Sequence, residues 1–352
     1  MTPQSSPSPP QPLGPSAPMP GAKFIGIDLG GTHIKAGLVD SAGKTLHAAT
    51  FDTPAESTPN AVVERIVALA RGMASETGID MADIAAMGIG VPGLIDSPTG
   101  VVKACVNLKD WHDVPLRDMV ADALGKPVVV DNDANAAAFG EFSMALRDTP
   151  DLQHLALITL GTGVGAGVVL NRLVFHGGGG LAGEVGHMIV LPDGHLCGCG
   201  QRGCLEQYTS ATSMVRDATE LIATGKRSRL AETLGTGEKM TTRHIFAAAA
   251  EGDRMAGKLI EDAAKYLAIA CINLCRVIDL QMIVIGGGVA NAGSALLVPI
   301  RHAFQDQTWG IEGACEPTVE VTKLGNDAGY IGAASLAKAT KSISSSHAMI
   351  AP

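Results

Sequence analysis

Several features that would direct this chain to a membrane or to nucleic acid are missing from its sequence. Aromatic residues make up only 3% of the 352 positions, and the formal net charge is -9 without any run of Lys and Arg. Glycines interrupt the apolar runs well before the roughly 18 residues that suggest a membrane span. We therefore expect a cytoplasmic protein that binds neither nucleic acid nor an anionic membrane surface.

The N-terminal region also lacks the apolar segment of a secretory signal. Residues 1–22 are rich in Pro, Ser, Gln and Gly, which predicts a disordered tail. Because no secretory signal is recognised, disulfide bonds among the seven cysteines are not favoured. The length suggests about two domains. Apolar residues at 46% and 43 glycines are typical of a globular α/β protein.

A glycine-rich segment from Gly183 to Glu206 concentrates the residue types that bind metals. It contains one imidazole and three thiols, at His187, Cys197, Cys199 and Cys204. Three thiolates and one imidazole complete a tetrahedral Zn²⁺ site and leave no position for an activated water, so the predicted metal is structural. Unrelated buried thiols are the alternative, and a disulfide between Cys197 and Cys199 is disfavoured by their closeness in sequence.

Two similar strand-turn-strand patterns occur in the two halves of the chain. Residues 24–40 contain two β-rich runs joined at Asp28-Leu-Gly-Gly-Thr32, and residues 155–170 repeat the plan with Gly161 aligned on Gly30. The repeat predicts two similar halves, each with a glycine-tipped hairpin. Such tips present N–H groups and hydroxyls with no Cβ in the way, so two facing tips would hold a polyphosphate. Ordinary tight turns are the alternative.

Between the hairpins, the apolar spacing predicts a helix from Thr58 to Glu76 and a strand from Ile84 to Val91. The segment Gly88-Ile-Gly-Val-Pro-Gly93 formally matches the dinucleotide fingerprint. Pro92 stands where that fingerprint needs a helix, so a Rossmann site is not predicted. The loop at Gly93 is either a surface for the substrate or a structural turn.

Residues 127–139 predict a buried strand that runs into an alanine-rich helix. Four polar residues mark the junction: Asp131, Asn132, Asp133 and Asn135. Asp133 occupies the predicted N-cap position. Because ligands of α/β sheets bind at the carboxyl ends of strands, a carboxylate here is also placed to accept the proton of a substrate hydroxyl.

In the second half, a long amphipathic helix is predicted from Met255 to Asp279. A buried strand then begins at Gln281 and ends in three glycines, which fit either a flat nucleoside or close packing against the next helix. A further strand is predicted from Val319 to Leu324 and a helix from Ala328 to Thr340. From Ser342 onward we expect fraying.

These motifs together resemble the ROK family (repressors, open reading frames and sugar kinases) over residues 22–340. Asp28-Leu-Gly-Gly-Thr-His-Ile-Lys35 resembles its first phosphate motif, and Leu160-Gly-Thr-Gly-Val-Gly165 its second. Ile285-Gly-Gly-Gly288 is similar to its adenosine motif, and the segments 183–187 and 197–206 are similar to its zinc-bearing signature. A P-loop and the protein-kinase signature set are absent.

The resemblance implies a duplicated actin-like (ribonuclease H-like) ATPase fold, in which two α/β domains enclose an interdomain cleft. The implied domains are residues 23–140 and 141–326, followed by a C-terminal helix at 327–341 that packs on the first domain and a frayed tail at 342–352. The implied cofactors are ATP with Mg²⁺ and a structural Zn²⁺. A homodimer is implied as well.

Carried over residue by residue, the resemblance makes Asp133 the general base for a sugar hydroxyl. The implied sugar ligands are Gly93, Asn107, Asn132, Asp133, Glu184, His187 and Glu206. The implied nucleotide contacts are Asp28, Gly30, Gly31, Thr32, Lys35, Gly161, Thr162, Gly163, Gly286, Gly287 and Gly288. His187 would bind zinc through one ring nitrogen and face the sugar through the other.

The expected activity is ATP-dependent phosphorylation of a hexose, with glucose favoured by Glu184 and by residues 107–111. Related kinases for N-acetylmannosamine, N-acetylglucosamine, fructose or allose differ at few positions, and polyphosphate is an alternative donor that the cysteine loop disfavours. A sugar-responsive regulator of the family would need a helix-turn-helix domain where the Pro/Ser-rich tail stands. An actin-like scaffold protein is a third possible function, but filament formation would not require paired glutamates beside a metal site.

Overall fold

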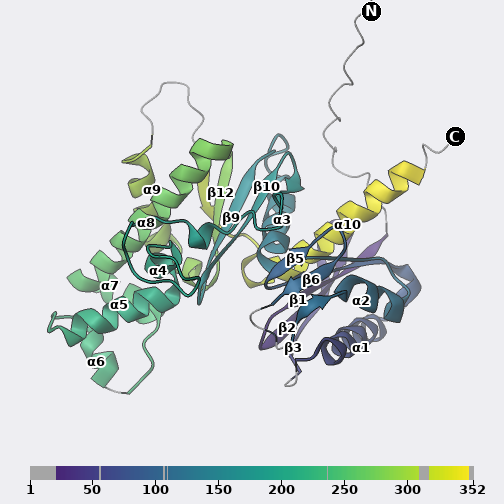
Figure 1. Cartoon of the computed structure of the whole chain (residues 1–352), viewed down its shortest axis with the longest axis horizontal. Helices are drawn as coiled ribbons and strands as arrows, with labels where there is room; N and C mark the ends of the chain where they lie inside the picture. Colours follow the sequence, from purple (N-terminus) through teal and green to yellow (C-terminus); the bar gives the residue numbers. More distant parts are fainter. Residues whose placement is uncertain are drawn as a thin grey trace, which may run out of the picture.

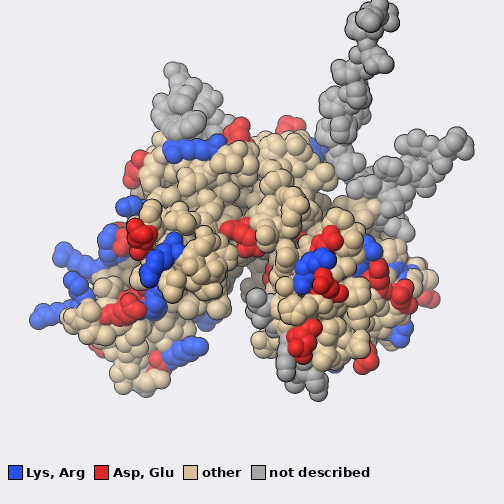
Figure 2. All heavy atoms as spheres, viewed as in Figure 1, with Lys and Arg blue, Asp and Glu red and all other residues tan. Residues whose placement is uncertain are grey.

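The structure is a computed structural model that describes residues 21–54, 57–105, 108, 110–235, 237–308 and 317–348. The chain forms two lobes, each built around a five-stranded sheet, with a hollow between them (Figures 1 and 2). None of the helices in these ranges combines the length and the apolar character that a membrane crossing needs.

The sheet of the first lobe has the strand order β3-β2-β1-β4-β8. β1 pairs with β2 and β2 with β3 in antiparallel fashion, whereas β4 and β8 run parallel to β1. Its strands are β1 (Lys23–Leu29), β2 (His33–Asp40), β3 (Thr45–Asp52), β4 (Ile84–Val91) and β8 (Val128–Asn132).

The sheet of the second lobe repeats this plan in the order β11-β10-β9-β12-β13. Its first two pairings are also antiparallel and its last two parallel. The strands are β9 (Leu155–Leu160), β10 (Val164–Leu170), β11 (Leu173–Val174), β12 (Met282–Gly286) and β13 (Thr318–Val321). Each sheet begins with a hairpin, so the predicted duplication is confirmed.

In the first lobe, one face of the sheet is covered by α1 (Pro59–Thr77) and α2 (Leu116–Leu124). Val62, Ile66 and Val120 of these helices are buried against the sheet residues Ile25 and Ile27. Thr58 caps α1 and Gly78 ends it in the left-handed conformation, as helix-end preferences favour. A small separate sheet of β5 (Leu94–Asp96), β6 (Val101–Ala104) and β7 (His112–Val114) follows β4.

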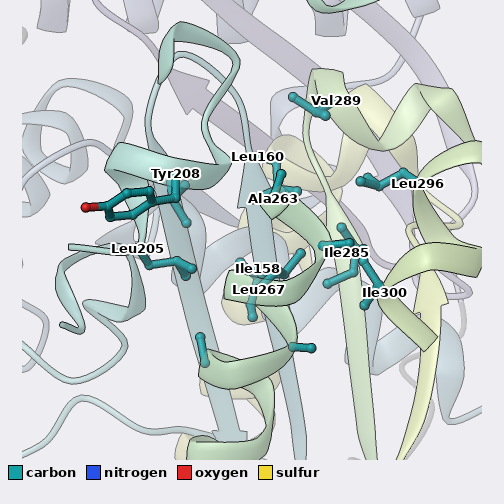
Figure 3. Close-up of a cluster of buried hydrophobic side chains, with 14 of the residues drawn as sticks. Ile158, Leu160, Leu205, Tyr208, Ala263, Leu267, Ile285, Val289, Leu296 and Ile300 are labelled. Atoms are coloured by element: carbon teal, nitrogen blue, oxygen red, sulfur yellow. The ribbon is translucent and has the colours of Figure 1, made fainter. Parts of the chain in front are cut away.

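In the second lobe, α8 (Arg254–Ile278) forms the centre of the core (Figure 3). Its Ala263 and Leu267 pack with Ile158 of β9 and Ile285 of β12, and burial of a side chain such as Leu267 contributes about 2 kcal/mol. The other helices of this lobe are α4 (Glu206–Thr209), α5 (Ala211–Ala223), α6 (Leu230–Gly235), α7 (Thr242–Ala250) and α9 (Ser294–Gln305).

Two helices, α3 (Asp133–Ala145) and α10 (Ala328–Ala348), lie where the lobes meet (Figure 1). α10 packs on α3 and on β1 and β4 of the first sheet, while α3 also packs on β10. The crossing of the two helices is close, because a Cβ at Gly332 would lie 1.7 Å from the Ala136 carbonyl oxygen. No larger residue fits there without moving one helix.

Two element ends differ from expectation. We expected fraying from Ser342, whereas α10 continues to Ala348, over a stretch without the Gly or Pro that would break a helix. We expected a strand as far as Leu324, whereas β13 ends at Val321. The following N–H groups of Lys323 and Leu324 donate to the buried Glu141 carboxylate of α3, at 3.2 and 2.9 Å, and so leave the sheet.

Candidate active site

The junction of β8 and α3 holds a partly buried carboxylate, Asp133. Asn132, not Asp133, is the N-cap of α3, because its Oδ1 accepts hydrogen bonds from the N–H groups of Ala134 and Asn135 at 2.9 and 3.2 Å. The predicted cap was therefore wrong by one residue. Asp133 begins the helix instead, and its Oδ1 accepts the N–H of Ala134 at 2.9 Å.

The electrostatic surroundings of Asp133 favour its protonated form. Burial raises the pKa of Asp133, three local hydrogen bonds lower it, and the negative charge of Glu184 raises it further. Asp28, the penultimate residue of β1, has its pKa raised to about 6 by burial and by Asp133, against the opposing charge of Lys35. Asp133 thus has Asp28 of the first lobe and Glu184 of the second lobe as electrostatic neighbours.

The Gly93 turn orients the Asn132 side chain. The Gly93 carbonyl accepts a hydrogen bond from Asn132 Nδ2 at 3.2 Å, and a Cβ at Gly93 would lie 2.2 Å from the Ala104 carbonyl oxygen. With both Oδ1 bonds used in capping, Asn132 retains one N–H of its amide for a ligand. The close approach to Ala104 therefore explains why residue 93 is a glycine in a structural turn. The contact of Gly93 with a sugar stays a prediction.

The first hairpin ends beside Asp28. The N–H of Gly30 donates to the His33 carbonyl at 2.9 Å, which closes the turn and leaves Gly31 and Thr32 exposed. Lys35 lies opposite Asp28 in the β1–β2 pairing and donates its Nζ to the Asn326 carbonyl at 3.0 Å. The predicted phosphate residues of this hairpin therefore lie on an open tip next to a buried carboxylate.

The second hairpin is held by α5 and by the adenosine motif. The N–H of Ala211 donates to the Gly161 carbonyl at 2.8 Å, and the Thr212 hydroxyl donates to the Thr162 carbonyl at 2.8 Å. Gly287 has φ of +82°, and a Cβ on it would lie 2.4 Å from the Leu160 carbonyl oxygen, so only glycine fits there.

The predicted adenosine motif therefore adjoins the second phosphate tip directly, through Gly287 and Leu160. A Cβ at Gly161 or at Gly288 would meet no atom within 4 Å. The remaining motif residues are Gly163, where a Cβ would lie 2.4 Å from Glu206 Oε2, and the buried Gly286 at the end of β12. The predicted contacts of Gly161 and Gly288 with the nucleotide stay a prediction.

The four predicted metal ligands come together. The imidazole and thiol ligand atoms of His187, Cys197, Cys199 and Cys204 all lie within 4.8 Å of one another. Cys197 Sγ is 3.7 Å from His187 Nδ1, and Cys199 Sγ is 3.6 Å from Cys204 Sγ. Zinc–sulfur bonds of about 2.3 Å place two tetrahedral sulfurs about 3.8 Å apart, so the donor set fits a closed zinc site.

Glu206 connects the cysteine loop to the second hairpin. One of its oxygens, Oε2, accepts the N–H of Val164 at 3.0 Å, while Oε1 lies 3.9 Å from Cys197 Sγ. Glu184 precedes the short helix η2 (Val185–His187), whose last residue is the predicted metal ligand His187. The loop thus carries Glu184, His187 and Glu206 on one framework. Asn107 lies outside the described residues.

Comparisons with known proteins agree with these motifs. The sequence model of the ROK family matches residues 24–340, which is most of the chain. This chain belongs to the ROK family. A curated ROK relative, the glucokinase of Thermotoga maritima, is 38% identical over 324 residues, covering 91% of this chain and 98% of the relative.

Other ROK proteins include both enzymes and regulators. The crystal structure of a ROK glucokinase from Streptomyces griseus, in complex with glucose and AMPPNP, has 37% identity and a TM-score of 0.72, and the match covers 90% of this chain and 99% of that one. A putative xylose repressor from a Caldicellulosiruptor strain is 31% identical over 309 residues, covering 88% of this chain and 76% of the repressor. The predicted family and fold class are therefore confirmed.

Sequence reasoning did not identify one polar contact beside the site. His176 Nε2 lies 2.7 Å from Asp131 Oδ2, although 45 residues separate the two in sequence. A histidine before a run of four glycines carries no local signal for such a partner. The pair forms because the segment that follows β11 lies beside the end of β8 in the folded protein.

Proposed function

We propose that this protein phosphorylates glucose with ATP to give glucose 6-phosphate. The observation that carries the proposal is the partly buried Asp133 carboxylate, which has Glu184 of the other lobe and Asp28 as electrostatic neighbours. The glucokinase relative and the glucose-bound ROK structure share this family over nearly the whole chain. Phosphoryl transfer requires mainly alignment of the two substrates and neutralisation of charge, which a site between two lobes can supply.

Asp133 is the proposed general base. With one oxygen held by the Ala134 N–H, its second oxygen accepts the proton of the sugar hydroxyl as that oxygen attacks the γ-phosphorus. A raised pKa suits this step, because a base whose pKa lies closer to the working pH takes the proton more readily. The N-cap role of Asn132 fixes the backbone on which Asp133 stands.

Glu184 and Glu206 are the proposed acceptors for the other sugar hydroxyls, with Asn132, His187, Gly93 and Asn107 as further ligands. Several fixed acceptors discriminate strongly against a sugar that lacks a matching hydroxyl, since a buried acceptor would then be unpaired. His187 Nδ1 lies on the thiol side of the ring, beside Cys197. This leaves Nε2 for the sugar.

The nucleotide binds, in this proposal, between the two hairpin tips and the adenosine motif. The backbone N–H groups of Gly31, Thr32, Thr162 and Gly163 donate to phosphate oxygens. Gly30 and Gly161 close the two turns with their N–H groups and border the phosphates, while Gly286, Gly287 and Gly288 border the adenosine. Lys35 lies beside Asp28 and adds positive charge at the first tip. Asp28 is the proposed carboxylate for Mg²⁺, which when bound neutralises phosphate charge.

His187, Cys197, Cys199 and Cys204 are the proposed zinc ligands. A bound zinc supplies a rigid cross-link between parts of the loop and no open coordination site. Through this cross-link, the loop holds Glu206 against the Val164 N–H of the second hairpin. The ligand set therefore positions sugar acceptors and leaves the chemistry to Asp133.

The predicted domain limits and the homodimer belong to the same proposal. The limit at residue 140 falls inside the continuous helix α3, so the helix itself links the domains at 23–140 and 141–326. The repeated strand order supports this division. Light scattering on the purified protein tests the dimer, which requires twice the mass of one chain.

The deciding experiment measures ADP release with glucose, N-acetylmannosamine, N-acetylglucosamine and fructose, with ATP or polyphosphate as donor. We expect the highest kcat/KM with glucose and ATP. Asp133→Asn removes the base but keeps the side-chain shape, so we expect kcat to fall by about 10²- to 10⁴-fold while glucose still binds. The control Asp122→Asn changes an exposed carboxylate of α2 and keeps full activity.

Three outcomes would contradict parts of this proposal. Full activity of Asp133→Asn would remove Asp133 from the mechanism. A higher kcat/KM with another sugar would change the substrate. Sugar binding without any ADP release would favour a regulator, the class represented by the repressor relative.

A further inference from the structure

One loop of the second lobe extends to the first lobe and leads to Glu184. We call residues 175–183, between β11 and η2, the strap loop. Its Phe175 N–H donates to the Val168 carbonyl of β10 at 2.8 Å, and its Ala182 N–H donates to the His176 carbonyl at 3.2 Å. A Cβ at Gly180 would lie 3.0 Å from the Ile95 carbonyl oxygen of β5. The strap loop is therefore closed on itself and lies against the first lobe.

His176 ties the strap loop to the end of β8. Its Nε2 is 2.7 Å from Asp131 Oδ2, and the Asp131 side chain is only 4% exposed. The other carboxylate oxygen, Asp131 Oδ1, accepts the N–H of Asn132 at 2.7 Å and Nδ2 of Asn135 at 3.1 Å. Asp131 thus joins the strap loop to the backbone that leads directly into Asp133.

The pair is more than a surface contact. A charge-assisted hydrogen bond to a buried carboxylate is short and strong, and removing its donor leaves a buried charge without compensation. The hydrogen bond to Asp131 raises the pKa of His176, which favours the imidazolium partner. Without the imidazole, Oδ2 of Asp131 loses its described partner while Oδ1 keeps the Asn132 and Asn135 donors. The carboxylate must then turn toward another donor or admit water, and the Asn132 N–H that it holds moves with it.

We propose that His176 is a positioning residue: by pairing with Asp131, it sets Glu184, which directly follows the strap loop, against Asp133. His176 is eight residues before Glu184, and Asp131 is two residues before Asp133. One ion pair between the lobes therefore holds both the sugar acceptor Glu184 and the base Asp133 in place. The inference rests on the proposed function, because it concerns the alignment of a sugar acceptor and the base.

The test compares His176→Leu, His176→Arg and His176→Gln with the wild type. We measure kcat, the KM values for glucose and ATP, and the glucose Kd by calorimetry without ATP. Misplacement of the reacting groups by about 1 Å can cost 10²-fold, so we expect His176→Leu to lose kcat/KM for glucose on the order of 10²-fold. The ATP KM stays unchanged, because the hairpin tips do not depend on this pair.

Rescue separates positioning from simple loss of packing. An Arg at 176 donates to the Asp131 carboxylate with a full charge, so we expect it to restore most of the activity, and Gln, a neutral donor, to restore less. The matched control is His47→Leu. His47 Nε2 lies 3.2 Å from Glu76 Oε2, and its side chain is 31% exposed against 33% for His176, but it lies on β3 away from the site.

Several results would overturn the inference. His176→Leu with unchanged glucose kinetics would show that the pair does not position the site. If the glucose and ATP KM values rise equally and the thermal midpoint falls, His176 contributes to general stability and not to positioning. The same conclusion follows if the Arg variant is as impaired as the Leu variant. If His176→Leu does not fold, the Arg and Gln variants decide alone. A wild type without glucose-dependent ADP release refutes the proposed function instead, so the two failures are distinguishable.

Discussion

Replacing Asp28 by Asn should stabilise the protein while it damages the site. Asp28 lies partly buried near the end of β1, where burial and the charge of Asp133 raise its pKa to about 6 and Lys35 only partly compensates. An ionised Asp28 is therefore unfavourable in the folded protein without ligands. The Asn side chain has nearly the same shape and no charge, so it removes this penalty.

The size and sign of the effect follow from the two pKa values. The ordinary value of 3.8 applies to the unfolded chain, and the folded value is about 6. A difference of about two units at 1.36 kcal/mol each gives at most about 3 kcal/mol. Below the lower pKa both states are protonated and nothing is lost. Stability falls as the pH rises between the two values, and the full penalty is present above the higher one.

The assay is urea unfolding of wild type and Asp28→Asn over a series of pH values, without nucleotide or divalent cation. We expect the variant to gain up to about 3 kcal/mol of unfolding free energy near pH 8 and little near pH 4. Asp122→Asn on α2 is exposed and serves as the control, with no gain at either pH. A gain that is absent near pH 8, or equal at both pH values, would refute the electrostatic reasoning.

The remaining predictions concern the metal loop and the adenosine motif. Cys199→Ser should lose bound zinc, measured by elemental analysis, and lower the thermal midpoint and the glucose affinity, whereas Cys275→Ser on α8 retains the metal. A zinc-free, fully active Cys199→Ser would contradict the coupling. Gly287→Ala should lose roughly 1–3 kcal/mol or more in urea unfolding, because of its positive φ and the Leu160 carbonyl. Gly288→Ala, in open space, should keep stability and raise only the ATP KM; unchanged ATP kinetics would remove it from the nucleotide site.

The sequence predicted those parts of the site whose signal is local. The metal ligands lie within one short loop, where spacing alone indicates that they meet, and they do. The hairpins were predictable because alternating apolar residues flank a glycine tip, and the same pattern occurs twice.

The β8–α3 junction shows where local reasoning fails. Asp131, Asn132 and Asp133 are all good capping residues, and nothing in the sequence decides among them. The structure assigns the cap to Asn132, whose backbone is extended with φ of -63° and ψ of 145°, and holds Asp131 with His176. Each of these choices depends on neighbours that are distant in sequence, so no pattern in residues 127–139 could have revealed them.

The same junction explains why stability and function oppose each other here. Asp28 and Asp133 are partly buried carboxylates that lie near each other, and the negative charge of the exposed Glu184 acts on Asp133, which raises the free energy of the ligand-free site. A protein selected for stability alone would replace at least one of them. A cation at Asp28 and a hydroxyl hydrogen at Asp133 would each relieve the conflict, so binding of nucleotide with metal and of sugar should stabilise the wild type more than Asp28→Asn. The carboxylates that destabilise the ligand-free protein are therefore the ones whose interactions improve most when the substrates bind.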